Sequence, residues 1–245
     1  MNRKPLGGKN YGSIPHLPGS RMGPGDYSCH EGQARISNHQ SRDMHDLIIV
    51  QEKLDGSNVG VAKIDGQVLA LTRAGYLANT SPYEQHHKFH EWVAANSDRF
   101  ETLLDDGERI VGEWLLQAHG TRYFLEHEPF VVFDIMRGSK RVTYGVLKDR
   151  VAGRFVLPNT IHVGGPLSIA DAMAKLGEFG AHGALDPIEG AIWRVERNEV
   201  IAPNRNGERR WIVDFLVKYV RPDKADGSYL ETMTGKPAVW NNEKP

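Results

Sequence analysis

The feature that most constrains the fold of this sequence is a hairpin pattern between residues 58 and 73. Apolar and polar residues alternate in 58–64 (NVGVAKI), and a second alternating run, 67–73 (QVLALTR), begins two residues later. The two intervening residues are Asp65 and Gly66. Asp-Gly is a preferred pair for two-residue hairpin turns, because both turn positions need a positive φ. The pattern therefore predicts two antiparallel strands.

Other strand and helix patterns surround this hairpin. Apolar runs typical of strands occur at 46–53 (DLIIVQEK), 108–116 (ERIVGEWLL), 129–136 (PFVVFDIM), 190–196 (GAIWRVE) and 211–220 (WIVDFLVKYV). Helices are expected from a cap at Ser81 to about Leu104, where Pro82 and Glu84 favour a helix start, over about 145–153, and from a cap at Ser168 to about Gly177. Strands joined by hairpins and separated by a few helices predict an α+β fold built on antiparallel sheets.

Domain boundaries follow from changes in composition along the chain. Residues 1–45 are rich in Gly, Pro and polar residues and predict an irregular N-terminal arm. The periodic patterns occupy 46–224, which we interpret as one domain, and 225–245 is expected to be a C-terminal tail. Only 24 residues follow Arg221, which is too few for an additional oligonucleotide-binding barrel.

Composition limits the classes of function. Cys29 is the only cysteine, which excludes an internal disulfide and a multi-cysteine zinc site. No apolar run is long enough for a membrane span, and no signal sequence is evident, so a cytoplasmic protein is expected. The net charge is -1, so nucleic-acid binding would need a local patch. Residues 194–224 are a candidate, and an ordinary solvated face is the alternative.

The stretch EKLDGSN, residues 52–58, raises the question of chemistry. Lys53 directly follows an apolar strand and precedes an Asp-Gly turn at Asp55 and Gly56. A lysine amine is a poor nucleophile while it is protonated, and burial or nearby cations activate it. By itself the pattern fits an ordinary surface lysine as well as a nucleophile held in a pocket.

Six stretches in order resemble the motifs of the covalent nucleotidyltransferases, the superfamily of ATP-dependent polynucleotide ligases and mRNA capping enzymes. EKLDGSN resembles the lysine signature K-x-D-G, in the form found in phage-type, ATP-dependent RNA ligases. The others are LTRAG with Arg73, VGEWL with Glu113, FVVFDI with Phe133, IEGAIWR with Glu189 and FLVKYV with Lys218. The resemblance implies an ATP-grasp-like ligase adenylation domain of antiparallel sheets flanked by helices.

The resemblance also implies roles for the residues that would react. Lys53 would attack the α-phosphorus of ATP and form a lysyl-AMP, and Lys218 would neutralise charge on the transferred phosphate. Glu189 would hold Mg²⁺ or Mn²⁺, directly or through water. ATP and a divalent metal are thus the expected cofactors.

Further residues would bind the nucleotide. Glu52 would accept a hydrogen bond from the adenine amino group, and Phe133 would stack on the base. Arg73 would position phosphates or ribose, Glu113 would bind ribose, and Asn58 would orient a phosphate or a metal-bound water. Asp55 either orients Lys53 or serves the turn through its own side chain.

The last motif departs from the family pattern K-x-K. Either Lys218 takes the place of the first lysine and Val220 replaces the second, or Leu216 replaces the first and Lys218 is the second. Arg221 is a candidate for the missing cation.

The function implied is sealing of 5′-phosphate and 3′-hydroxyl RNA ends, with RNA ends or a nicked duplex as the nucleic-acid partner. Whether a protein partner supplies the substrate specificity stays open. The alternatives are a minimal DNA ligase, a GTP-using capping enzyme, which Glu52 disfavours, and a binding module that has lost catalysis. His86, His87 and His90 could in principle include a zinc-binding pair, but a solvated helix face is the preferred interpretation.

Overall fold

The hairpin forms as predicted. β2 (Ser57–Ile64) and β3 (Gln67–Thr72) pair antiparallel, and the turn between them has φ of 50° at Asp65 and 76° at Gly66. The computed structural model describes residues 4–200 and 208–241. Within them, no helix is long and apolar enough to cross a membrane.

The chain divides into two units, and neither unit is continuous in sequence. Unit 1 consists of residues 55–157 with the described parts of Met1–Gly12 and Gly227–Pro245, and unit 2 consists of Ser13–Leu54 and Pro158–Asp226. The boundary at residues 54 and 55 lies inside the EKLDGSN stretch. Lys53 therefore belongs to unit 2, and Asp55 belongs to unit 1.

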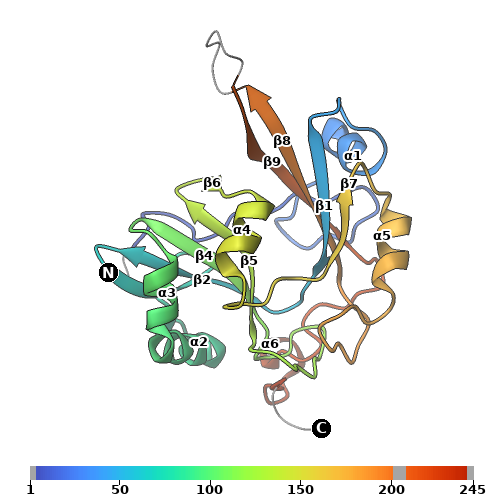
Figure 1. Ribbon diagram of the computed structural model, residues 1–245. Coiled ribbons are helices and arrows are strands. Elements are labelled where there is room, and N and C mark those ends of the chain that lie inside the picture. Colours follow the sequence, from blue (N-terminus) through green and yellow to red (C-terminus); the bar gives the residue numbers. More distant parts are fainter. Residues whose placement is uncertain (1–3, 201–207, 242–245) are drawn as a thin grey trace. The chain divides into compact units, whose positions relative to one another are not determined.

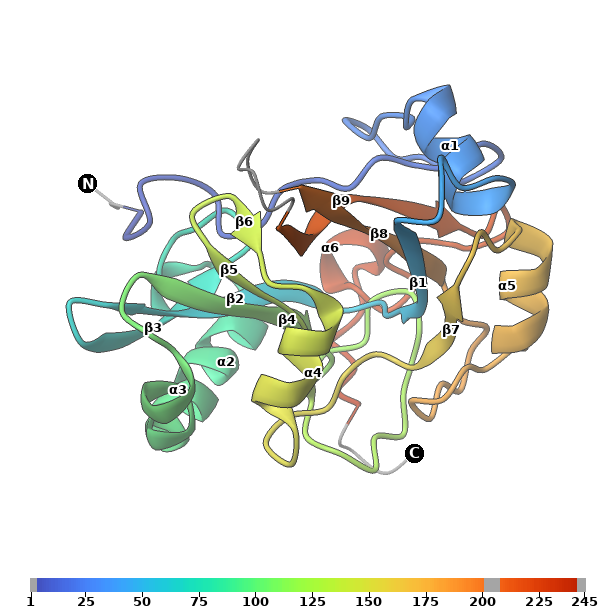
Figure 2. The same ribbon diagram turned by 45° about the horizontal axis from the view of Figure 1, so that its top comes forward.

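Unit 1 is built on a five-stranded sheet in the order β3-β2-β4-β5-β6. Helices cover one face of this sheet (Figure 2), and the core beneath them is aromatic, with Phe89, Phe100, Trp114 and Phe130 at most 1% exposed. The remaining elements of this unit are η1 (Ala78–Thr80), α2 (Glu84–Ala95), α3 (Ser97–Leu103), β4 (Glu108–Trp114), β5 (Phe130–Arg137), β6 (Lys140–Arg141), α4 (Tyr144–Val151) and α6 (Glu231–Thr234).

Unit 2 is built on a four-stranded sheet in the order β7-β1-β8-β9 (Figure 1). Its strand β1 pairs with β7 on one side and β8 on the other, and Ile48, Ile49 and Val50 are fully buried. This burial explains the uninterrupted apolar run before Lys53. The elements are α1 (Glu31–Asn38), β1 (Asp46–Lys53), β7 (Thr160–Gly164), α5 (Ile169–Leu176), β8 (Gly190–Val200) and β9 (Arg209–Val220).

All strand pairs in the two sheets are antiparallel, so the predicted α+β class is confirmed. The prediction of one helix from Ser81 to Leu104 is wrong in two respects. Helix α2 begins at Glu84 after Tyr83, because the Ser81 hydroxyl is hydrogen-bonded to His86 Nδ1 at 2.6 Å. The chain then breaks at Asn96, whose side-chain amide donates to Trp92 O at 2.8 Å and competes with the helical bonds.

The N-terminal segment is more ordered than its composition predicts. It contains the helix α1, which has a capping box at His30 and Gln33. Residues 4–12 pack in unit 1, where Asn10 N donates to Arg73 O at 3.1 Å, and residues 13–45 pack in unit 2. Helix α1 is thus a regular element that the composition of this segment does not predict.

Candidate active site

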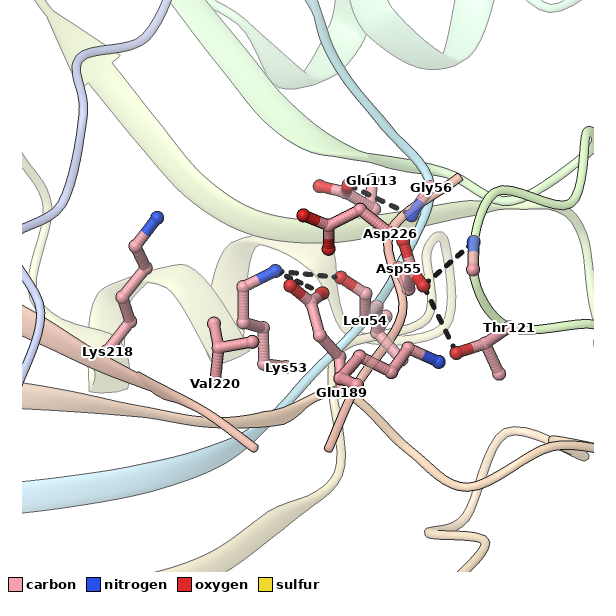
Figure 3. Close-up of polar contacts among 12 residues, drawn as sticks. Lys53, Leu54, Asp55, Gly56, Glu113, Thr121, Glu189, Lys218, Val220 and Asp226 are labelled. Carbon is pink, nitrogen blue, oxygen red and sulfur yellow. Dashed lines mark hydrogen bonds and ion pairs between the residues drawn. The ribbon is translucent and has the colours of Figure 1, made fainter. Parts of the chain in front are cut away.

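Lys53 is the last residue of β1, on the rigid central part of the sheet of unit 2. Its side chain is 19% exposed, and its Nζ donates a hydrogen bond to Glu189 Oε2 (Figure 3). Glu189 directly precedes β8, whose first residue, Gly190, pairs with Lys53. The sheet register therefore holds the amine and the carboxylate together, and Lys53 is not an ordinary surface lysine.

Gly190 allows the next strand to approach. Gly190 also pairs with Val220 of β9, and a Cβ at Gly190 would collide with the backbone carbonyl oxygen of Tyr219. Lys53, Gly190 and Val220 thus form one row across three strands. Lys218, two residues before Val220, projects to the same side of β9 (Figure 3).

Lys218 is the second cation of this cluster. Its side chain is 15% exposed, and Nζ donates to Asp26 Oδ1 at 3.3 Å. Burial and the nearby Lys53 cation lower the pKa of Lys218, while Asp26 and Glu189 act in the opposite direction. Two lysines and two carboxylates of unit 2 therefore share one small region.

Glu52 is deeply buried, at 2% exposure, in the same unit. Ala181 N donates to its Oε2 at 3.0 Å, and Oε1 is buried with no hydrogen-bond partner among the described residues. Burial raises the pKa of Glu52 to about 7. Gly180, at a φ of 60°, lets the loop lie against the carboxyl group, which a Cβ there would strike. The free acceptor fits a donor such as an adenine amino group.

In unit 1, the rest of the signature loop is anchored by its polar groups. Asp55 Oδ2 accepts hydrogen bonds from Gly120 N at 3.0 Å and Thr121 Oγ1 at 3.2 Å (Figure 3). Glu113 Oε1 accepts one from Gly56 N at 3.2 Å. Asp55 is thus tied to a distant loop. This bonding differs from a local turn contact, and an orienting role towards Lys53 stays a prediction.

Asn58 pairs directly with Glu113 across β2 and β4, and its Oδ1 is buried with no partner among the described residues. Phe133 lies at a bulge of β5, between the pairs Gly112–Val132 and Val111–Asp134. A bulge redirects a side chain. Among the ring pairs described, the half-buried Phe133 ring pairs only with Tyr11, in a T-shaped arrangement with the ring centroids 5.2 Å apart.

Arg73 follows β3 and is exposed, and its carbonyl oxygen holds residues 10 and 11. The sheet of unit 1 thus carries the four predicted residues Asn58, Arg73, Glu113 and Phe133, whereas Glu52, Lys53, Glu189 and Lys218 belong to unit 2.

Three polar groups near these residues were not predicted. Asp26 and His16 lie beside Lys218 in unit 2. In unit 1, His86 Nε2 is hydrogen-bonded to Ser57 Oγ at 2.9 Å, and burial lowers the pKa of His86 to about 4. His86 is 9% exposed, so the predicted solvated helix face is wrong at this residue. No group of three potential ligands that could hold a metal ion occurs among the described residues.

Ion pairs engage several cations of the predicted basic patch at 194–224. Arg194 is buried against Glu196 at 2.8 Å, and Arg221 pairs with Asp223 at 2.7 Å. Arg197 lies between Asp43 and Asp46, at 2.7 and 2.8 Å. Arg205 lies outside the described residues. Arg194, Arg197 and Arg221 are thus paired with carboxylates of the same unit.

Solved structures identify the fold. An RNA ligase of Naegleria gruberi, in a structure with PPi, matches with a TM-score of 0.51 and 14% identity over 91% of this chain and 62% of that chain. A mutant of the same ligase with ATP and Mn gives a TM-score of 0.51 and 12% identity over 85% and 59%. At such identities the similarity shows the fold alone, which is that of a ligase adenylation domain. The predicted fold is thus confirmed, and the chain spans less than two thirds of the Naegleria ligase.

The family follows from the sequence match. The family model for RNA ligase matches residues 46–220, which include all nine predicted site residues. This chain belongs to the RNA ligase family, as its motifs predict. A short match of 32 residues, 53% identical, also links it to an uncharacterized protein of Methanocaldococcus jannaschii, covering 13% of this chain and 8% of that protein.

Proposed function

We propose that this protein is an ATP-dependent RNA ligase that seals 5′-phosphate and 3′-hydroxyl ends through a lysyl-AMP. One observation carries the proposal. Lys53 ends a buried strand, its amine is paired with Glu189, and Lys218 projects from the adjacent part of the sheet. Such a held and partly desolvated amine, with a second cation nearby, has the setting that a nucleophilic lysine needs.

The first step would be transfer of AMP to Lys53. The deprotonated Nζ forms a bond to the α-phosphorus while the bond from that phosphorus to the pyrophosphate oxygen breaks. Pyrophosphate leaves with the electron pair, and the amine proton passes to an acceptor. Because Glu189 holds Lys53, this pair must open before attack. The AMP would then pass to a 5′-phosphate end, and a 3′-hydroxyl would displace it.

Lys218 supplies a fixed positive charge for the phosphate that is transferred. Glu52 would read adenine through its unpaired oxygen, which favours ATP over GTP. From unit 1, Phe133 would contribute base stacking, and Arg73, Glu113 and Asn58 would contribute polar contacts to ribose and phosphates. These assignments rest on the motif positions.

The residues present fit a divalent metal that arrives with the nucleotide. Mg²⁺ keeps several waters and commonly takes only one or two protein carboxylates in addition to substrate phosphates. Glu189 would be such a ligand. The metal would supply charge neutralisation at the phosphates. A metal held in this way needs only one or two carboxylates of the protein, and the described residues contain no group of three potential ligands.

The proposal is tested by intact mass after incubation with ATP and Mg²⁺ in the absence of nucleic acid. A mass gain of one AMP is expected for the native protein and for Lys63→Ala, and no gain is expected for Lys53→Ala. Lys63 is a matched control, because its Nζ only donates to Glu101 O at the surface. Absence of any gain from folded, initially unadenylated protein would leave a nucleic-acid-binding module as the better proposal.

The substrate needs a separate comparison. We propose RNA ends or a nicked duplex as the partner, because the chain belongs to the RNA ligase family. Sealing of a nick in all-DNA and in RNA-containing duplexes by the same preparation distinguishes an RNA ligase from a DNA ligase. The same proposal includes a cytoplasmic location for the protein and a protein partner that supplies its substrate specificity.

A further inference from the structure

Residues 15–21 cover the free edge of β9 at the last motif. Leu17 N donates to Lys218 O at 2.8 Å, and Lys218 N donates to Pro15 O at 2.9 Å. Further along, Arg21 N donates to Val220 O at 3.0 Å, and Val220 N donates to Ser20 Oγ at 2.9 Å. The N-terminal segment is therefore a built part of this sheet, at the residues where the family motif lies.

A second layer of bonds fixes a histidine and an aspartate against Lys218. The backbone of His16 pairs with Tyr27 and Cys29, each at 2.8 Å. Its buried ring lies between Ser20 Oγ, 2.6 Å from Nδ1, and Asp26 Oδ2, 3.1 Å from Nε2. Ser20 can donate to Nδ1, whereas the contact of Nε2 with Asp26 is a close polar contact without hydrogen-bond geometry.

Asp26 is held by more than its partner lysine. Gly23 N donates to Asp26 Oδ2 at 2.9 Å, so the loop orients the carboxylate, and the His16 ring lies beside it. Its other oxygen accepts from Lys218 Nζ at 3.3 Å. The bond to Gly23 and the nearby Lys218 cation lower the pKa of Asp26 against the effect of burial, so it is an anion at neutral pH.

We infer that Asp26 is a positioning residue for Lys218: it holds the ammonium group in one place and keeps it charged, and the bond from Gly23 N fixes Asp26. The inference rests on the proposed function of Lys218 at the transferred phosphate. A lysine side chain loses much rotamer freedom when it is held. Ordering it before the nucleotide arrives removes that entropic cost from the reaction and leaves a preorganised positive charge.

The groups facing Lys218 define the expected pH dependence. Lys53 from β1 opposes its charge, whereas Asp26 from the N-terminal segment and Glu189 from the start of β8 support it, and His16 lies behind Asp26. Loss of the Asp26 charge therefore lowers the pKa of Lys218 further, and the alkaline limb of the adenylation profile moves to lower pH.

The test is a double-mutant cycle on the single-turnover rate of enzyme adenylation. Asp26→Asn should slow the reaction about tenfold at pH 8, because small displacements of a positioned group have effects of this size or larger. The variant should leave the KM for ATP within about threefold, and Asp26→Glu should restore part of the rate. In a Lys218→Gln background, Asp26→Asn should have no further effect. Glu31→Gln removes an exposed carboxylate from the same segment and serves as the matched control.

A second readout does not depend on activity. Limited acetylation at pH 8, followed by peptide mass mapping, should label Lys218 several-fold more in Asp26→Asn than in native protein, with Lys63 unchanged. If the native protein is not adenylated at all, the proposed function fails, and the labelling alone decides whether Asp26 controls the charge of Lys218. The inference is overturned if the adenylation rate and the labelling are both unchanged, or if the two substitutions act additively.

Discussion

The buried carboxyl group of Glu52 should make the stability of unit 2 depend on pH. Glu52 is 2% exposed, accepts one backbone hydrogen bond and has a pKa raised from 4.5 to about 7 by burial. An acid with a raised folded-state pKa favours folding while it is protonated. Its ionisation opposes folding, so stability is lost as the pH rises from the unfolded value, 4.5, through about 7.

The size of the effect follows from these two values. Linkage gives a loss of about 1 kcal/mol at pH 5 and about 3 kcal/mol at pH 8, relative to strongly acid solution. Glu52→Gln removes this dependence, although an unpaired buried amide adds a constant cost of about 1 to 3 kcal/mol. The difference between native protein and variant should therefore change by about 2 to 3 kcal/mol between pH 5 and pH 8 in favour of the variant.

Urea unfolding of both proteins at the two pH values measures this change. Glu108→Gln is the matched control, because Glu108 is also buried but pairs with Arg150 at 2.7 Å. Burial alone would raise the pKa of Glu108, but the bonds from Arg150 and from Asp105 N lower it. The contribution of a carboxylate with a lowered pKa is fully present above its unfolded value, 4.5. The difference between Glu108→Gln and native protein should therefore be nearly the same at pH 5 and pH 8, and it should shrink only as the pH falls below that value. A pH-independent difference for Glu52→Gln would refute the reasoning and place Glu52 in a solvated or paired setting.

Two further predictions concern the row across the sheet of unit 2. In thermal unfolding, Gly190→Ala should destabilise the protein by about 2 kcal/mol or more, because the new Cβ meets backbone atoms. Gly165→Ala is the control, because a Cβ there meets nothing within 4 Å, and it should change stability by less than about 0.5 kcal/mol. Equal effects of the two substitutions would contradict the close approach of the strands at Gly190. Val220→Lys adds a cation beside Lys218, so we expect a KM for ATP about tenfold lower than in Val220→Met; no difference between the two would mean that a charge at this position does not reach the nucleotide.

Elements with strong local signals were predictable, whereas the contacts that complete the site were not. The hairpin turn at Asp65 and Gly66 follows from a local conformational preference of these two residues, and an unbroken apolar run indicates strand β1. Strand β7 (Thr160–Gly164) was missed, because its residues are half-buried or exposed and include His162. The break at Asn96 was missed because a side-chain bond to Trp92 overrode the helical pattern.

The candidate site shows the same division. The motifs located Lys53, Glu189 and Lys218 by their types and order, and the register of β1, β8 and β9 brings them together. Nothing near Glu52 in the sequence indicates that its carboxyl group is covered by residues 180 and 181. Asp26 lies in a segment without periodicity, so its place beside Lys218 depends on long-range pairing.

The covered edge of β9 has a consequence for choosing expression boundaries. A protein trimmed to the family match, which begins at residue 46, would lose the segment that pairs with Lys218 and Val220. The backbone amide and carbonyl groups of both residues would then face water as an open strand edge. Open edges are templates on which other chains add strands, so the trimmed protein should self-associate or aggregate. The N-terminal residues therefore act as the edge protection of this sheet.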